Sequence, residues 1–188
     1  MFLPVSTERP SLLLHICCAP CATHAVRLLS EAHAVTGFFS NSNIAPREEY
    51  DLRLDTARQL ARLCEIALIE DAYDHAAWLE AVKGLEKEPE RGRRCEACFR
   101  YNLARAAAYA AAHGFDRFTT TLTISPHKDT RTIFAIGRSL GPFLEVDLKK
   151  QDGFLKSRAL SRDYGLYRQD YCGCEFSRRP PRASPPPA

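Results

Sequence analysis

Short apolar runs alternate with longer amphipathic segments along most of this chain. The first run, residues 12–16, is too short for a helix, and Ser11 and a group of cysteines bound it. Apolar runs of this length between polar residues are typical of buried strands. We therefore predict strands at residues 12–16, 35–39, 66–69, 118–122 and 143–146.

The segments between these runs have helical spacing. In the first, Ala22, Val26 and Leu29 recur at intervals that place them on one helix face. Pro46 stands where the first turn of a helix tolerates proline, and Gly114 stands where a C-cap favours glycine. We predict helices at residues 19–32, 46–64, 95–113, 129–140 and 152–162, and one more that includes 78–82.

Strands that alternate with helices indicate βαβ units. With 188 residues, the chain is long enough for one domain with a sizeable core. We therefore predict a single α/β domain over residues 11–177, with a mainly parallel sheet flanked by helices. Such sheets bind ligands at the carboxyl ends of their strands, which is where the motif at 15–21, HICCAPC, falls.

The two ends of the sequence are predicted to lie outside this domain. Residues 178–188 contain five prolines and cannot build a core, so we expect a disordered tail. The first ten residues include acid and two prolines, and the apolar stretch after them is too short for a signal peptide. No stretch is long enough to span a membrane, so we expect a cytoplasmic protein that binds no membrane.

The overall charge permits nucleic-acid binding without requiring it. There are 26 basic and 23 acidic residues, a formal net charge of +3. Many proteins with no nucleic-acid partner have a similar balance. Charge alone therefore does not decide the class of partner.

Cysteine content separates this chain from an ordinary soluble protein. It has eight cysteines, and a reducing compartment disfavours disulfides, so metal binding or redox chemistry is the better explanation. Cys64 stands alone on an apolar helix face and is predicted to be a core thiol. The other seven come from three distant segments: Cys17, Cys18, Cys21, Cys95, Cys98, Cys172 and Cys174.

Three interpretations of these seven thiols differ in what they explain. A CxxC at a strand–helix junction alone suits a thioredoxin-like redox site, and two CxxC pairs suit structural zinc. Seven thiols exceed one tetrahedral zinc ion and suit a [4Fe–4S] cluster, which takes four thiolates. The remaining thiols are then free to bind a second metal or to act in redox chemistry. The radical-SAM spacing CxxxCxxC is absent.

Five motifs follow one another along the chain: HICCAPC at 15–21, SNSNIAPREEYDLR at 40–53, RCEACFRYNLARAA at 94–107, TTTLTISPHKD at 119–129 and YRQDYCGCEFS at 167–177. Together they resemble the QueH family of epoxyqueuosine reductases. The resemblance covers residues 11–177, in order. It implies a reductase that removes the epoxide oxygen of epoxyqueuosine in the tRNA anticodon. It also implies a [4Fe–4S] cluster, an adjacent mononuclear iron, an external electron donor and a nucleotide-binding type of sheet.

The resemblance assigns the seven grouped thiols to the two metals but leaves open which thiol binds which metal. Cys17, Cys18, Cys95, Cys98, Cys172 and Cys174 match the family motifs, and Cys21 is the seventh candidate. The chain departs from the family at 40–43, where SNSN replaces an expected aromatic-Asn-Pro-Asn turn. At Cys21 the family varies between cysteine and another metal ligand.

Reducing an epoxide to an alkene needs protons as well as electrons, so proton donors are expected near the metals. The catalytic candidates are Lys128, Asp129 and Tyr101, and capping is the structural alternative for Asp129, which opens a helix. His15 precedes the cysteines, either as a core histidine or as a hydrogen-bond partner of a thiolate. Further polar candidates are His127, Tyr50 and Tyr171.

Candidate substrate contacts fall in the same motifs. Unpaired anticodon bases are recognised by stacking and by edge hydrogen bonds, so amides and aromatics are suitable partners. Glu49 and Arg53 also have the spacing of an ordinary surface ion pair. The candidates for substrate binding are Asn41, Asn43, Tyr50, Arg53 and Arg168. Candidates for phosphate contact are Arg91, Arg93, Arg94, Arg100, Lys149, Lys150, Lys156, Arg158, Arg162 and Arg168.

Two other functions compete with the reductase. A tRNA sulfurtransferase of the ATP-pyrophosphatase type needs a glycine-rich phosphate loop after the first strand, where this chain has HICCAPC. A zinc-stabilised RNA-binding module would be colourless, with two or fewer zinc ions. Iron and sulfide content separates these functions from the reductase.

Overall fold

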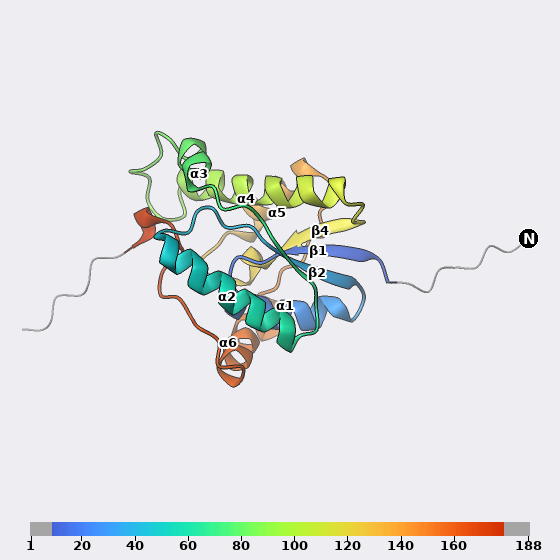
Figure 1. Cartoon of the computed structure of the whole chain (residues 1–188). Helices are drawn as coiled ribbons and strands as arrows, with labels where there is room; N and C mark the ends of the chain where they lie inside the picture. The colour runs from blue at the N-terminus through green and yellow to red at the C-terminus, as the bar shows by residue number, and fades with distance from the viewer. Residues whose placement is uncertain (1–8, 179–188) are drawn as a thin grey trace, which may run out of the picture.

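Four parallel strands form the centre of the molecule in the computed structural model, which describes residues 9–178. The strands are β1 (Ser11–His15), β2 (Ala34–Phe39), β3 (Leu68–Glu70) and β4 (Arg117–Thr120), in the spatial order β3-β2-β1-β4. Every pairing is parallel. The predicted single α/β domain with a parallel sheet is confirmed (Figure 1).

Helices cover both faces of this sheet (Figure 1). On one face lie α1 (Ala19–Ser30) and α2 (Arg47–Leu63), and α6 (Gly153–Asp163) packs against α1. On the other face lie α4 (Arg93–Ala112) and α5 (Thr130–Leu140), with α3 (His75–Ala81) packed on α4. The sheet is therefore buried on both sides, as parallel sheets generally are.

Strand β1 shows why its sequence is apolar at nearly every position. Leu12 and Leu14 pack into the core with α1 and α2, whereas Leu13 packs into the core with α4 and α5. All three are fully buried. Alternate side chains of a strand point to opposite faces, so a strand between two helical layers needs an apolar residue at each position.

Two predicted strands differ from the structure around β4. The predicted strand 118–122 ends at Thr120, because the Thr120 hydroxyl accepts a hydrogen bond from Leu122 N and starts a 3₁₀ helix, η1 (Thr121–Ile124). The predicted strand 143–146 is reduced to one bridge with Phe118. In a regular sheet the backbone carbonyls of residues 144 and 146 would accept hydrogen bonds from backbone amides of the neighbouring strand. Here they accept from threonine hydroxyls: Thr119 Oγ1 donates to Leu144 O and Thr123 Oγ1 to Val146 O, both at 2.8 Å.

The third predicted strand is shifted. Ile66 N donates to the carbonyl of Ala61 in the turn that follows α2, so residue 66 is not yet in the sheet, and β3 begins at Leu68. Glu65 has a positive φ of 53°, which turns the chain between the two elements. The helix ends differ from the predictions by only a few residues.

The strand order creates a switch point between β1 and β4. After β1 the chain moves through β2 to β3 on one side, and it returns through α4 to place β4 on the other side of β1. The segments that leave β1 and β4 therefore diverge, which opens a crevice at the carboxyl ends of these strands. The first cysteines lie there.

Within residues 9–178, no helix combines the length and the apolar character that crossing a bilayer requires. The predicted disordered tail begins at Arg178, and its remaining residues lie outside the described part of the chain.

Candidate metal centre

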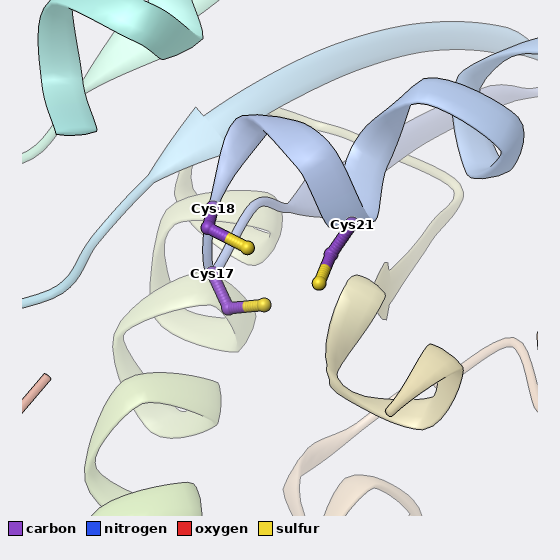
Figure 2. Close-up of side chains that lie close together, drawn as sticks. All are labelled: Cys17, Cys18 and Cys21. Atoms are coloured by element: carbon purple, nitrogen blue, oxygen red, sulfur yellow. The ribbon is translucent and has the colours of Figure 1, made fainter. Parts of the chain in front are cut away.

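The first thiol group consists of Cys17, Cys18 and Cys21, which lie where β1 passes into α1. Their Sγ atoms all lie within 4.8 Å of one another and point into a common space (Figure 2). Cys18 is the N-cap residue of α1, with extended backbone, and Pro20 occupies the first turn. Proline is tolerated there because the first amides of a helix have no intrahelical acceptor.

A contact across the switch point fixes Cys17. Thr121, just after β4, accepts a hydrogen bond from Cys17 N at 3.0 Å, and its hydroxyl lies 3.2 Å from Cys17 Sγ as a donor. The segments that follow β1 and β4, on the two sides of the crevice, therefore both contribute to the position of this thiol. A hydroxyl that donates to sulfur favours the thiolate form, which is the form that binds metals.

The three thiols have unequal acidities. Hydrogen bonds with Cys17 and then Cys21 lower the pKa of Cys18, whereas hydrogen bonds with Cys17 and then Cys18 raise the pKa of Cys21. The hydrogen bond with Cys18 is also the main cause of the raised pKa of Cys17. Three thiolates this close repel one another, so a cation must be bound for all three to ionise.

The second thiol group consists of Cys95, Cys98, Cys172 and Cys174. Cys95 and Cys98 lie in the first two turns of α4, and the other two lie in the loop after α6. All four line one small pocket. Burial raises the pKa of Cys95 and of Cys98, and the other thiols of the group add to both shifts.

Amide donors approach two sulfurs of the second thiol group. The backbone amide of Arg91 donates to Cys95 Sγ at 3.2 Å, and Asn102 Nδ2 lies 3.8 Å from Cys98 Sγ. Asn102 Nδ2 also donates to Asn43 Oδ1 at 2.9 Å. These donors stabilise negative charge on sulfur, as a metal-binding thiolate requires.

Arg53 holds the loop that carries Cys172. Its guanidinium is buried and donates to the carbonyls of Cys172 and Tyr171 at 3.0 and 3.2 Å, and to Glu49 at 2.7 Å. Gly173 packs closely here, with a φ of 140°, and any Cβ would lie 3.2 Å from the Arg53 guanidinium. A glycine is therefore required between Cys172 and Cys174.

A cavity of about 860 Å³ joins the two thiol groups. Thiols of both groups line it, namely Cys17, Cys18, Cys21, Cys98 and Cys172. Five basic residues line it against two acidic ones: Arg91, Lys128, Arg158, Arg168 and Arg178 against Glu90 and Asp170. A positive, partly enclosed cavity attracts anionic ligands.

Lys128 is the basic residue most closely coupled to the thiols. It is half-buried in the cavity wall. Burial alone would lower its pKa, but ionised thiols of both groups, Cys172 and Cys17 foremost, raise the pKa above its ordinary value. Lys149 supports this segment by donating to the carbonyl of Lys128 at 3.1 Å. Lys128 is therefore an ammonium that faces both thiol groups.

The structure brings several of the predicted site residues to the cavity. Asn41 lines it and donates to the carbonyl of Ile16 at 2.8 Å, next to Cys17. The whole segment 40–43 is buried. The other predicted residues in the cavity wall are Asn43, His127, Lys128, Arg168 and Tyr171, together with five of the seven thiols.

Four of the predicted catalytic and substrate-binding residues do not line this cavity. Asp129 caps α5 and accepts from Arg131 N and Thr132 N, so it fills the capping role. Tyr50 is buried among aromatic rings, and its hydroxyl lies 3.4 Å from the carbonyl of Asp71. Arg53 holds the C-terminal loop, and Tyr101 packs near Arg105, whose guanidinium lies 5.9 Å from its ring.

The predicted phosphate contacts fall into three sets. Arg91, Arg158 and Arg168 line the cavity. Arg94 is buried and donates to the carbonyls of Glu86 and Glu88, so it orders the turn before α4. The remaining candidates lie outside the cavity: Arg93, Arg100, Lys149, Lys150, Lys156 and Arg162.

His15 and Cys64 have the structural roles that the sequence offered for them. His15 is fully buried, and its ring nitrogens lie 2.8 Å from Thr120 Oγ1 and 3.1 Å from the carbonyl of Ser40. Burial lowers its pKa. Cys64 ends α2 and packs against the core beside α1, although it is only partly buried.

Three residues of the site were missed by the sequence analysis. Thr121 and Asn102 donate toward thiols, and both lie inside motifs that the analysis quoted without assigning them a role. Trp78 lines the pocket of the second thiol group. Its signal was available, because it is the one tryptophan in the sequence.

Comparison with known proteins agrees with this geometry. A family model described as Epoxyqueuosine reductase QueH matches residues 12–180. A protein of that name from Streptococcus pyogenes is 38% identical over 180 residues, and the alignment covers 90% of this chain and 71% of the relative. A second, from Staphylococcus epidermidis, is 36% identical over 183 residues, and the alignment covers 90% of this chain and 77% of the relative. The relative from Acinetobacter baylyi is 37% identical, covering 94% of this chain and 84% of its own length. The chain therefore belongs to the QueH family of epoxyqueuosine reductases.

Proposed function

We propose that this protein reduces epoxyqueuosine in the tRNA anticodon to queuosine. The reaction consumes two electrons and two protons, replaces the epoxide with an alkene and releases water. The catalytic domain spans residues 11–177, and tRNA maturation gives the protein a cytoplasmic location. The observation that carries the proposal is that two separate thiol groups open onto one positively charged cavity.

The first thiol group fits a single iron ion. Metal–sulfur bonds of about 2.3 Å in a tetrahedral site place the sulfurs about 3.8 Å apart. The thiols of Cys17, Cys18 and Cys21 lie within 4.8 Å of one another, so small side-chain movements bring them to that spacing. Three protein ligands leave one position open, as in catalytic metal sites.

The second thiol group fits a [4Fe–4S] cluster. Each of the four thiolates binds a different iron of the cluster, so their sulfurs must lie further apart than ligands of one ion. The four thiols of this group share one pocket, yet they do not form a set within 4.8 Å of one another in residues 9–178. This assignment uses all seven grouped cysteines and leaves Cys64 in the core.

When bound, the cluster would supply electrons one at a time, and the adjacent iron would act as a Lewis acid toward the epoxide oxygen. Lys128 is placed to hold negative charge that develops in the cavity, since it is a half-buried ammonium facing both thiol groups. Its Nζ can also donate a proton to the departing oxygen. Asn41 and Asn43 present amides to the same cavity for substrate hydrogen bonds.

The cavity suits one nucleotide of a tRNA. Its volume lies within the usual range of small-ligand sites, about 300–1,000 Å³. The anticodon is unpaired, so a single modified base can enter while its neighbours stay outside. Arg158 and Arg168 then meet the flanking phosphates. Cys172 is exposed, which gives an external electron donor access to the second thiol group.

Metal analysis and turnover test this proposal together. Protein purified without oxygen is expected to contain about five irons and four sulfides per chain, and to convert epoxyqueuosine tRNA to queuosine tRNA with a chemical reductant. The product is measured in nucleoside digests by mass spectrometry. Zinc without sulfide, in protein made with ample iron, would contradict the proposal and leave a structural metal module.

A further inference from the structure

Trp78 has a buried donor without an acceptor. Its side chain is fully buried, and within residues 9–178 nothing accepts a hydrogen bond from Nε1. An unpaired buried N–H costs about 1–3 kcal/mol, so such groups are rare and call for an explanation. Phenylalanine would fill much of this space without that cost.

The indole is held firmly beside the second thiol group. Asp74 caps α3 by accepting from Ala77 N, and the indole packs against His75 and Phe176 with ring centroids 5.4 and 6.2 Å away. Trp78 lines the pocket that all four thiols of the second group share.

A metal-bound thiolate is a much better acceptor than a neutral thiol. Cluster binding at the second thiol group therefore supplies the acceptor that the indole otherwise lacks. Asn102 approaches Cys98 from its own helix, at 3.8 Å. Trp78 comes from a different element, α3, so the indole and Asn102 reach the second thiol group independently.

Resting on the proposed function, we propose that Trp78 is a positioning residue of the iron–sulfur cluster. Its Nε1–H donates a hydrogen bond to a thiolate of the second thiol group, whose pocket it lines, and raises the reduction potential of the cluster. Hydrogen bonds to cluster sulfurs stabilise the reduced form more than the oxidised form, because the reduced form carries one more negative charge. The donor therefore makes the cluster easier to reduce.

The test is the reduction potential of the loaded protein, with Trp78→Phe as the first variant. This change keeps an aromatic ring and removes the N–H. We expect wild-type iron and sulfide content, and a tenfold fall in the equilibrium constant for one-electron reduction, equivalent to about 59 mV. The potential is measured by anaerobic redox titration, followed by visible absorption and electron paramagnetic resonance.

Two further proteins separate the hydrogen bond from packing. Phe176→Leu disturbs the ring against the indole and leaves the N–H in place, so the potential is expected to stay within a twofold change in that equilibrium constant. Because the chain has a single tryptophan, that residue alone can be replaced by its benzothiophene isostere, in which sulfur takes the place of N–H. The isostere is expected to lower the potential as Trp78→Phe does, and it decides the question if Trp78→Phe does not fold.

The outcomes distinguish this inference from the proposed function. A wild-type protein without iron and sulfide would overturn both. A loaded wild type whose potential is unchanged in Trp78→Phe and in the isostere would overturn only the inference, and Trp78 would then be a packing residue. An equal drop in Phe176→Leu would also overturn it, because packing alone would then account for the effect.

Discussion

The two thiol groups face one cavity but are assembled in opposite ways. The first comes from five consecutive residues at the turn between β1 and α1, and one threonine after β4 completes it. The second joins the start of α4 to a loop more than 70 residues later in the sequence, which depends on Arg53 from α2. One group is local, and the other exists only when the tertiary structure has closed.

This difference has a functional consequence. Helix α1 packs directly on the sheet and against α6, so the first thiol group is preorganised. In the second thiol group, Cys172 is exposed and lies in a loop. We infer that the first thiol group holds the metal with the open coordination position, where geometry matters most. The second thiol group, near the surface, would then hold the cluster that accepts and transfers electrons.

The largest effect is expected when one thiol is removed from each group. Under the proposed assignment each group holds a different metal, so Cys98→Ser is expected to lose about four irons and the sulfide, and Cys18→Ser about one iron. Neither variant should turn over. Iron and sulfide analysis on protein purified without oxygen measures both effects. Equal losses in the two variants would show that the seven thiols form one mixed site.

Sequence patterns predicted the frame of the first thiol group better than that of the second. The short apolar runs were sufficient for the parallel sheet, because both faces of each strand must be buried. They also placed Cys17, Cys18 and Cys21 at a strand end. Where threonines replaced backbone partners, around residues 118–124 and 143–146, the patterns were wrong, since apolar spacing carries no information about hydroxyl hydrogen bonds.

Arg53 shows why the second group was harder to predict. Its spacing from Glu49 has the form of a surface pair, and its motif suggested substrate contact, yet the structure buries it against the carbonyls of Cys172 and Tyr171. Contacts between residues about 120 positions apart leave no periodic signal. Only the fold reveals that this arginine supports the cysteine loop.

Arg53→Met is expected to give the next largest effect. It leaves the Glu49 carboxylate without its buried cation and two loop carbonyls without donors, so we expect a loss of about 3–5 kcal/mol in the free energy of unfolding. Sulfide should be lost before the single iron. Urea unfolding and metal analysis of the anaerobic protein measure these changes.

Arg47→Met on the same helix is the matched control. Its pair with Asp51 is exposed, with side-chain accessibilities of 60% and 50%, and is worth about 0.3–0.5 kcal/mol. A similar loss in both variants would mean that α2 tolerates neither change, and that the loop has no special dependence on Arg53.

A smaller effect is expected from Thr121→Val, which acts on the first thiol group alone. Valine keeps the shape of threonine and removes both the donor to Cys17 Sγ and the acceptor for Cys17 N. Loss of such an outer partner weakens metal binding about 10–100-fold. Competition with a chelator should release one iron earlier than in wild type and leave the sulfide in place.

Thr119→Val controls for the loss of a buried hydroxyl at the same sheet edge. The Thr119 hydroxyl donates to the carbonyl of Leu144, and within residues 9–178 it makes no hydrogen bond to a thiol. We expect a stability loss of about 1 kcal/mol, as for an ordinary hydrogen bond, with no change in chelator competition. Earlier iron release from this control as well would mean that general loosening, and not the contact with Cys17, explains the Thr121 result.

The smallest expected effect concerns the side from which tRNA approaches the two groups. Arg158 lies on α6, which packs against the helix of the first thiol group, and it lines the cavity. Arg162 lies one turn later and does not line it.

Arg158→Gln should weaken binding of an anticodon stem-loop several-fold and reduce the slope of log affinity against log salt by about 0.7–0.9, as for one lost phosphate contact. Arg162→Gln should change neither, in fluorescence anisotropy titrations at several salt concentrations. If Arg162→Gln has the larger effect, the tRNA backbone crosses the outer face of α6, and the first thiol group is approached from outside the cavity.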